Sequence, residues 1–224
     1  LRLANSAYYH VSRTIGTVGE ALSMLGFVTV RTLVISSGLT GGYKAMPGMD
    51  LTKFWRYSLH TAAVAGWLAK KTGVNGDQAF TVALMHGIGQ LVMHAGMPEQ
   101  MLQIDKMASP MDARRFDIER TSFGYTFANV GAELAKQWRF PTAFVDAIAN
   151  FPEPLTTEPL NQVAACIHLA AWRARAEHNG LNQEEMAATV PGDVCKALGL
   201  SPETFLTEMP PLAELCEGLE ALLS

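Results

Sequence analysis

Residues 83–91 read Ala-Leu-Met-His-Gly-Ile-Gly-Gln-Leu and lie inside an apolar segment of the chain. The hydrophobic residues of this segment recur at helical spacing, and they include Phe80, Ala83, Leu84, Ile88 and Leu91. Asp77 precedes them as a candidate N-cap. We therefore predict a helix over residues 77–94, with the imidazole of His86 near its centre.

The same helical periodicity continues on both sides of this segment. Asp50 or Thr52 is expected to cap a long helix that runs to about Lys71 and stops at Gly73. Further helices are predicted over about residues 17–26, 29–41, 98–107, 111–122, 126–138, 142–150 and 160–177, with short helices over 181–224 and a helix end at 1–7. No stretch shows the alternation of a strand, so the predicted fold class is all-α, a compact helical bundle without substantial sheet.

Composition excludes several classes of protein. The chain has 224 residues, of which 49% are hydrophobic and 17% charged, so it can bury a core and is not a disordered sequence. Charged residues interrupt every long apolar run, which argues against a membrane span. Three cysteines favour a reducing cytoplasm over a disulfide scaffold.

Charge is distributed unevenly along the chain. The net charge of −4 combines +5 over residues 1–140 with −9 over residues 141–224, and this pattern does not indicate nucleic-acid binding. Arg114 and Arg115, with Arg120 nearby, are interpreted as a solvated helix face, with phosphate binding as the alternative.

Residues 83–91 are similar to the Gly-Leu-Leu-His-Asp-Ile-Gly-Lys-Leu run of the HD superfamily of metal phosphohydrolases. Other stretches resemble a narrower branch, the HDOD (HD-related output domain) family: residues 1–7, 15–26, 54–58 and 131–138, the last followed by Pro141. The resemblance implies an HD-like helical domain over residues 1–180 whose N-terminal helix is truncated. Residues 181–224 then form an acidic helical extension packed on it.

The resemblance also locates the places where catalytic relatives hold one or two metal ions that activate water against a phosphate ester. These places fall on Tyr57, His86-Gly87, Phe127 and Phe151-Pro152. A metal needs about three or four protein ligands, and only His86 remains among these positions. We therefore expect no bound metal, no cofactor and no catalytic residue.

Helical spacing groups the residues around these positions. Tyr57, His60, Thr61 and Val64 share one face of the first long helix, and His86, Gln90 and Met93 share one face of the next. If the two helices pack side by side, they leave a vestigial cleft lined by Tyr57, His60, His86, Gly87, Gln90, Phe127 and Phe151. We expect hydrophobic core to fill this cleft, because phenylalanine is large and brings no hydrogen-bonding group. A small apolar pocket with a few polar handles is the alternative.

The function indicated is a non-catalytic module of bacterial signal transduction, located in the cytoplasm. Its expected partners are other signalling domains or proteins, with a small ligand as a further option and without nucleic acid or membranes. Two alternatives stay open. One is a metal-dependent phosphohydrolase with a rearranged site, and the other is a nucleotide or small-ligand receptor that uses the vestigial cleft.

Overall fold

Every regular element in the part of the chain that the structure describes is a helix. The structure is a computed structural model, and it describes residues 48–217 and residue 219. The helices are α3 (Leu51–Thr72), α4 (Gly76–Met85), α5 (Ile88–Gly96), α6 (Pro98–Met107), α7 (Arg115–Phe123), α8 (Phe127–Gln137), α9 (Thr142–Asn150), the 3-10 turn η2 (Pro154–Thr156), α10 (Gln162–His178), α11 (Gln183–Thr189), α12 (Gly192–Ala197), α13 (Pro202–Glu208) and α14 (Leu212–Leu215). The all-α prediction is confirmed. The elements expected over residues 1–7, 17–26 and 29–41 lie outside the described residues.

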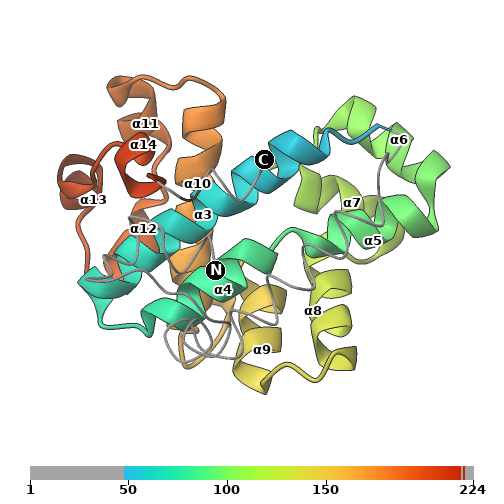
Figure 1. The fold of residues 1–224 in the computed structure, drawn as a ribbon, viewed down its shortest axis with the longest axis horizontal. Coiled ribbons are helices and arrows are strands. Elements are labelled where there is room, and N and C mark those ends of the chain that lie inside the picture. Colours follow the sequence, from blue (N-terminus) through green and yellow to red (C-terminus); the bar gives the residue numbers. More distant parts are fainter. Residues whose placement is uncertain (1–47, 218, 220–224) are drawn as a thin grey trace, which may run out of the picture.

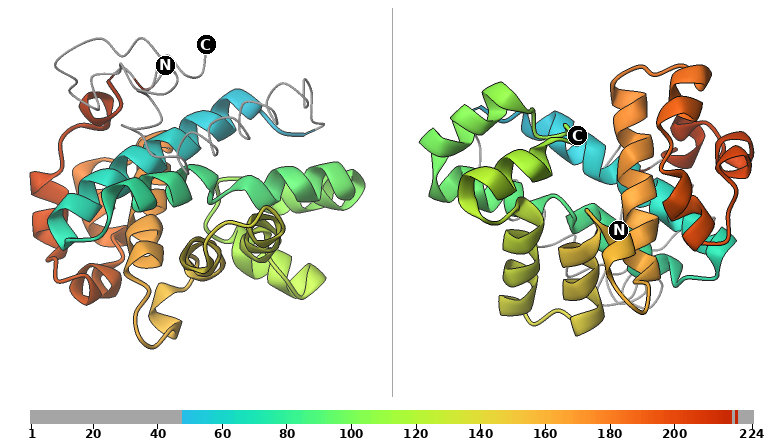
Figure 2. Two further views of the ribbon diagram at one scale, coloured as in Figure 1. Left: turned by 60° about the horizontal axis from the view of Figure 1, so that its bottom comes forward. Right: turned by 180° about the vertical axis from the view of Figure 1, so that it is seen from behind.

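Helix α3 is the central element of the fold. It crosses the middle of the molecule, with α5–α8 toward one end and α11–α14 toward the other (Figures 1 and 2). Its ends lie where the sequence places them, because the Asp50 carboxylate accepts the Lys53 N–H at 3.0 Å and Gly73 adopts the left-handed conformation at φ 74°. Among the described helices, none is long and apolar enough to cross a membrane.

The prediction of one helix over residues 77–94 is wrong. Helix α4 is capped by the Asn75 side chain, not by Asp77, and it ends at Met85. A turn at His86 and Gly87 follows before α5 begins. The physical reason is a close crossing of α5 and α8. A Cβ atom on Gly89 would lie 1.9 Å from the backbone oxygen of Phe127, so only glycine allows this approach.

The start of the helix predicted over residues 111–122 also moves. Residues 109–114 form turns, in which the Asp112 carboxylate accepts the Arg114 N–H at 2.9 Å, and α7 begins only at Arg115. This side-chain bond to the backbone competes with helix formation. The other predicted helices that the structure describes agree within about two residues, the usual uncertainty of a helix end.

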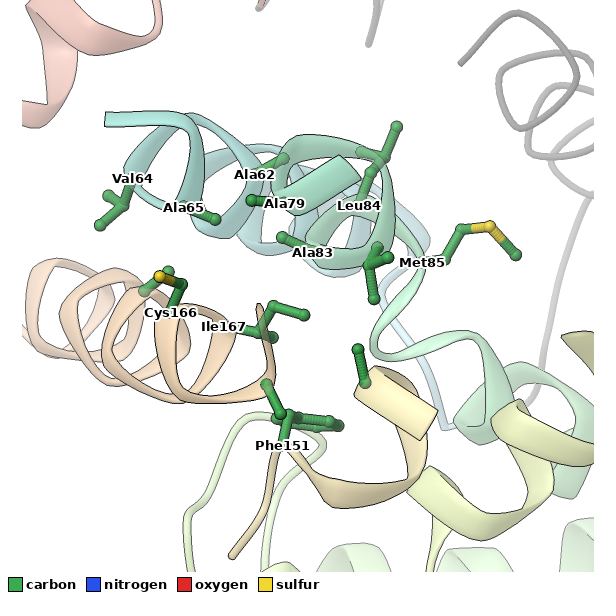
Figure 3. Close-up of a cluster of buried hydrophobic side chains, with 14 of the residues drawn as sticks. Ala62, Val64, Ala65, Ala79, Ala83, Leu84, Met85, Phe151, Cys166 and Ile167 are labelled. Carbon is green, nitrogen blue, oxygen red and sulfur yellow. The ribbon is translucent and has the colours of Figure 1, made fainter. Parts of the chain in front are cut away.

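The core lies where α3, α4 and α10 meet. Alanines occupy the contact between α3 and α4, which lets the two helices approach closely, and Cys166 and Ile167 of α10 face them (Figure 3). Helices α12 to α14 contribute Val194, Phe205 and Leu212 to the same buried cluster. The Lys71 ammonium also donates to the Glu208 carboxylate at 2.8 Å. The C-terminal helices are therefore packed on α3 and α10, while a domain boundary near residue 180 stays a prediction.

Candidate functional site

Two aromatic side chains from distant parts of the chain contact the ring of His86. The ring of Tyr57, on α3, lies edge-on to the His86 ring with 5.3 Å between centroids. The ring of Phe151, at the end of α9, meets the other side of His86 at the same distance. The His86 side chain is only 1% exposed. The fold thus brings together three of the positions at which the sequence analysis placed former metal ligands.

Phenylalanine fills the space beside this group. Phe127, at the start of α8, lies 6.1 Å from Phe151 and stacks on Phe116 at 4.8 Å, measured between ring centroids. Phe116 also meets Phe151 at 5.6 Å. The cavity left at this point is about 10 Å³, enough for one water molecule at most. Sequence reasoning missed Phe116, because a lone phenylalanine in a charged helix carries no motif signal.

Burial keeps the His86 imidazole neutral. It lowers the pKa of His86 to about 4, although a hydrogen bond with the Ala83 carbonyl acts in the opposite direction and the charge of Arg175 adds a smaller lowering. Because a carbonyl only accepts hydrogen bonds, Nδ1 carries the proton and donates to Ala83. His86 is therefore a satisfied core histidine at neutral pH.

The residues around His86 do not fit a catalytic metal ion. A Cβ atom on Gly87, where the sequence analysis expects a lost ligand carboxylate, would lie 3.1 and 3.2 Å from two ring atoms of Phe54. An aromatic ring thus borders the place of the missing side chain. Among the described residues, no three His, Cys, Asp or Glu side chains come close enough together to hold a metal ion.

Two of the predicted cleft residues take separate positions. Gln90, now on α5, donates from Nε2 to the Pro110 carbonyl at 2.8 Å and borders the 10 Å³ cavity. His60 does not border it. It lines a depression of about 200 Å³ between α3 and α10, together with Tyr57 and Glu177. Tyr57 lines both the 10 Å³ cavity and the 200 Å³ depression. Its hydroxyl accepts a hydrogen bond from Arg175 at 3.1 Å.

A buried ionic network supports the phenylalanine cluster. Arg115 donates to the Glu119 carboxylate at 2.8 Å and to Asp105 at 2.7 Å, and its side chain is 0% exposed. The interpretation of Arg115 as part of a solvated helix face is therefore wrong, whereas its neighbour Arg114 is 72% exposed. His94 joins the network through a 2.9 Å contact with Asp105. No local pattern predicts this burial, because Asp105 and His94 join the network from two other helices, α6 and α5.

Burial and hydrogen bonding compete at the two carboxylates of this network. Burial raises the pKa of Glu119, and the Phe127 N–H and the Arg115 guanidinium offset this only in part. Burial also acts to raise the pKa of Asp105, but hydrogen bonds from His94 and Arg115 outweigh it, so that this pKa lies below its usual value. Arg115 is thus the common partner of both carboxylates.

Known proteins resemble this chain in sequence and in fold. A family model, the HDOD domain, matches residues 1–154. A candidate phosphohydrolase from Shewanella amazonensis SB2B is 28% identical, with a TM-score of 0.74 over 99% of this chain and 78% of that one. No curated protein matches the sequence.

Two further solved structures share the fold at lower identity. An HDOD domain protein of unknown function from Geobacter sulfurreducens has a TM-score of 0.68 at 20% identity, covering 99% of this chain and 78% of that one. The MmoQ response regulator from Methylococcus capsulatus str. Bath has a TM-score of 0.58 at 21% identity, covering 100% of this chain and 82% of that one.

Proposed function

The chain belongs to the HDOD domain family, and from this membership we propose that it is a non-catalytic signalling module whose former metal site has become part of the core. One observation carries the proposal. Among the described residues, Phe116, Phe127 and Phe151 fill the space next to Tyr57 and His86, and the cavity that they border is about 10 Å³.

The chemistry of metal phosphohydrolases supports this reading. Such an enzyme needs a metal ion held by about three protein ligands, with an open position for the water that attacks the phosphate ester. Here Tyr57, Gly87 and Phe127 stand at ligand positions, and none of them offers the imidazole or carboxylate of the family pattern. The candidate phosphohydrolase from Shewanella amazonensis shares the fold, and the enzymatic alternative for this chain would need a differently built site.

Family membership supports a signalling role for this chain. The HDOD fold occurs in the MmoQ response regulator, so this architecture is compatible with signal transduction. The proposed partners are other signalling domains or proteins that bind to the surface of the helices. The three described cysteines are free and buried, which is consistent with the cytoplasmic location we propose.

A ligand receptor at the former cleft is the less favoured alternative. Small-molecule pockets have volumes of roughly 300–1,000 Å³, and the 10 Å³ beside His86 is far below that range. Any ligand there would first have to displace Phe127 or Phe151 from the core.

Metal content and phosphodiesterase activity of the purified full chain test the proposal. The chain is incubated with manganese, iron(II) or zinc, passed through a desalting column and analysed for bound metal and for hydrolysis of bis(p-nitrophenyl) phosphate. We expect less than stoichiometric metal and no turnover above the protein-free rate. Stoichiometric metal that is lost in His86→Ala, with hydrolysis lost in parallel, would overturn the proposal.

A further inference from the structure

A basic depression lies on the outer side of Tyr57, away from the phenylalanine cluster. It has a volume of about 200 Å³ and is formed by the first half of α3 and the last turns of α10. Lys53, Arg56 and His60 line it from α3, where spacings of three and four place them on one face. Glu177 and His178 face them from α10.

Among the described residues, the acidic groups of this depression do not balance its basic groups. Its one acidic residue, Glu177, accepts a hydrogen bond from Arg173 at 2.9 Å. Lys53 approaches the Asp50 carboxylate only at 3.8 Å, and both side chains are more than half exposed, so this ion pair is weak. Within residues 48–217, neither Arg56 nor His178 forms an ion pair. An excess of positive charge therefore remains on the lining.

The place of Lys53 in its helix adds to the positive charge at this end of α3. Lys53 lies in the first turn of α3, where the helix dipole favours negative charge and disfavours a lysine. No acidic residue occupies that turn, and the Asp50 cap is outside it. The Asp50 carboxylate already caps the positive end of the helix, so a bound anion would pair mainly with the ammonium of Lys53.

A second depression next to the first provides room for the remainder of a ligand. His178 lines both, and the second has a volume of about 330 Å³ with Arg175, Asn179, Ser109 and Trp172 in its wall. The acidic residue there, Asp112, is engaged by Arg114 at 2.6 Å. The second depression thus offers hydrogen-bond donors and an indole ring, and these groups suit the polar organic part of a ligand that carries the anion.

We propose that these adjoining depressions bind a small phosphorylated ligand, with its phosphate held by Lys53 and Arg56. Guanidinium and ammonium groups are the side chains best suited to phosphate oxygens. The ligand would contact the outer side of Tyr57, whose inner side meets His86 and whose hydroxyl is bound by Arg175. This inference does not depend on the loss of catalysis, because the site lies outside the phenylalanine cluster.

Calorimetric titration of the full chain with inorganic pyrophosphate tests the proposal at constant ionic strength. We expect saturable binding with a Kd of about 1 mM or tighter. Arg56→Gln should weaken binding about tenfold or more, because a hydrogen bond between charged groups is lost. Glu177→Gln should strengthen it, since this change removes the one negative charge of the lining.

Lys136→Gln serves as the matched control. This lysine lies on α8, is 71% exposed and approaches only Glu133, so its loss should leave the Kd within about twofold. Circular dichroism shows whether each variant is folded.

Three outcomes would overturn the proposal. The first is no saturable binding at about 10 mM pyrophosphate, roughly tenfold above the expected Kd. The second is an equal loss in Arg56→Gln and Lys136→Gln, which would indicate non-specific attraction. The third is tighter binding of a hexaglutamate peptide with the same dependence on Arg56, which would assign the surface to an acidic protein segment. The metal content is measured in a separate experiment. A failure of pyrophosphate binding would therefore not bear on the proposal that the chain is non-catalytic.

Discussion

The carboxylate of Glu119 accepts the backbone N–H of Phe127 at 2.7 Å and, through its other oxygen, binds the Arg115 guanidinium at 2.8 Å. One buried side chain thus joins α7 to the first residue of α8. Phe127 is also the residue that fills the space beside Phe151. The ionic network and the plugged interior are therefore parts of one structure, which leads to the first prediction.

Arg115→Met should destabilise the fold by about 3–5 kcal/mol, because it leaves the buried Glu119 carboxylate without its cation. Urea unfolding followed by circular dichroism measures the change. Arg114→Met is the control: this neighbouring side chain is 72% exposed and its ion pair should contribute no more than about 1 kcal/mol. Equal effects of the two substitutions would show that Arg115 is not buried as described.

Phe127→Ala should cost roughly 3–5 kcal/mol, since it opens a cavity between Phe116 and Phe151 that the helices cannot close. The same unfolding experiment applies. Leu155→Ala, at a side chain that is 48% exposed, should change stability by no more than about 0.5 kcal/mol. If Phe127→Ala falls within that small range as well, the interior is not plugged.

Gly87→Asp should destabilise the chain without creating a metal site. The new side chain meets the Phe54 ring and places a carboxylate in a buried position, at a cost of about 1–3 kcal/mol. Adding Phe54→Ala should relieve the steric part, so the double variant should be more stable than the sum of the two single changes implies. Metal analysis of Gly87→Asp should find no stoichiometric ion, and recovery of metal by this single change would contradict the expectation.

Gly89→Ala should be among the most damaging small substitutions in the chain. Its Cβ atom would lie 1.9 Å from the Phe127 backbone oxygen, so α5 and α8 must separate, at a cost of about 1–3 kcal/mol or more. Gly96→Ala, in the same helix and with nothing within 4 Å of the added Cβ, should be close to neutral. Thermal unfolding of the two variants compares the effects directly.

The free energy of unfolding should decrease as the pH is lowered, and His86 should account for part of this decrease. Its pKa is about 4 in the folded chain against 6.5 ordinarily, so the unfolded chain takes up the proton first. The stabilising contribution is full above about pH 6.5 and is lost as pH falls toward 4. Between about pH 7 and pH 5 the free energy of unfolding should drop by about 2 kcal/mol more in the native chain than in His86→Leu. Urea unfolding at both pH values measures this difference, and equal drops would show that the ring is not buried neutral.

The fold class and most helix ends can be predicted from the amino-acid sequence alone. Asp50 and Gly73 fix α3 through a local side-chain cap and a left-handed residue, and both signals lie within a few residues of the bond they make. The apolar spacing likewise indicated the buried faces. The motif around His86 indicated the family, which the family model confirms, while the positions of the lost ligands stay a prediction.

How the helices pack against one another depends on contacts between residues that are far apart in the chain. The turn at Gly87 exists because α5 must cross α8 at Gly89, a contact between residues about 40 positions apart that no local pattern encodes. The burial of Arg115 depends on Asp105 of α6 packing against α7, the helix that already carries Glu119, and an isolated arginine is ordinarily solvated. His60 and Tyr57 share a helix face, yet the position of α10 leaves His60 outside the cluster around His86. Hydrogen bonds between neighbouring residues can be predicted from the local sequence. The environment of each side chain depends on packing between helices that are distant in the chain.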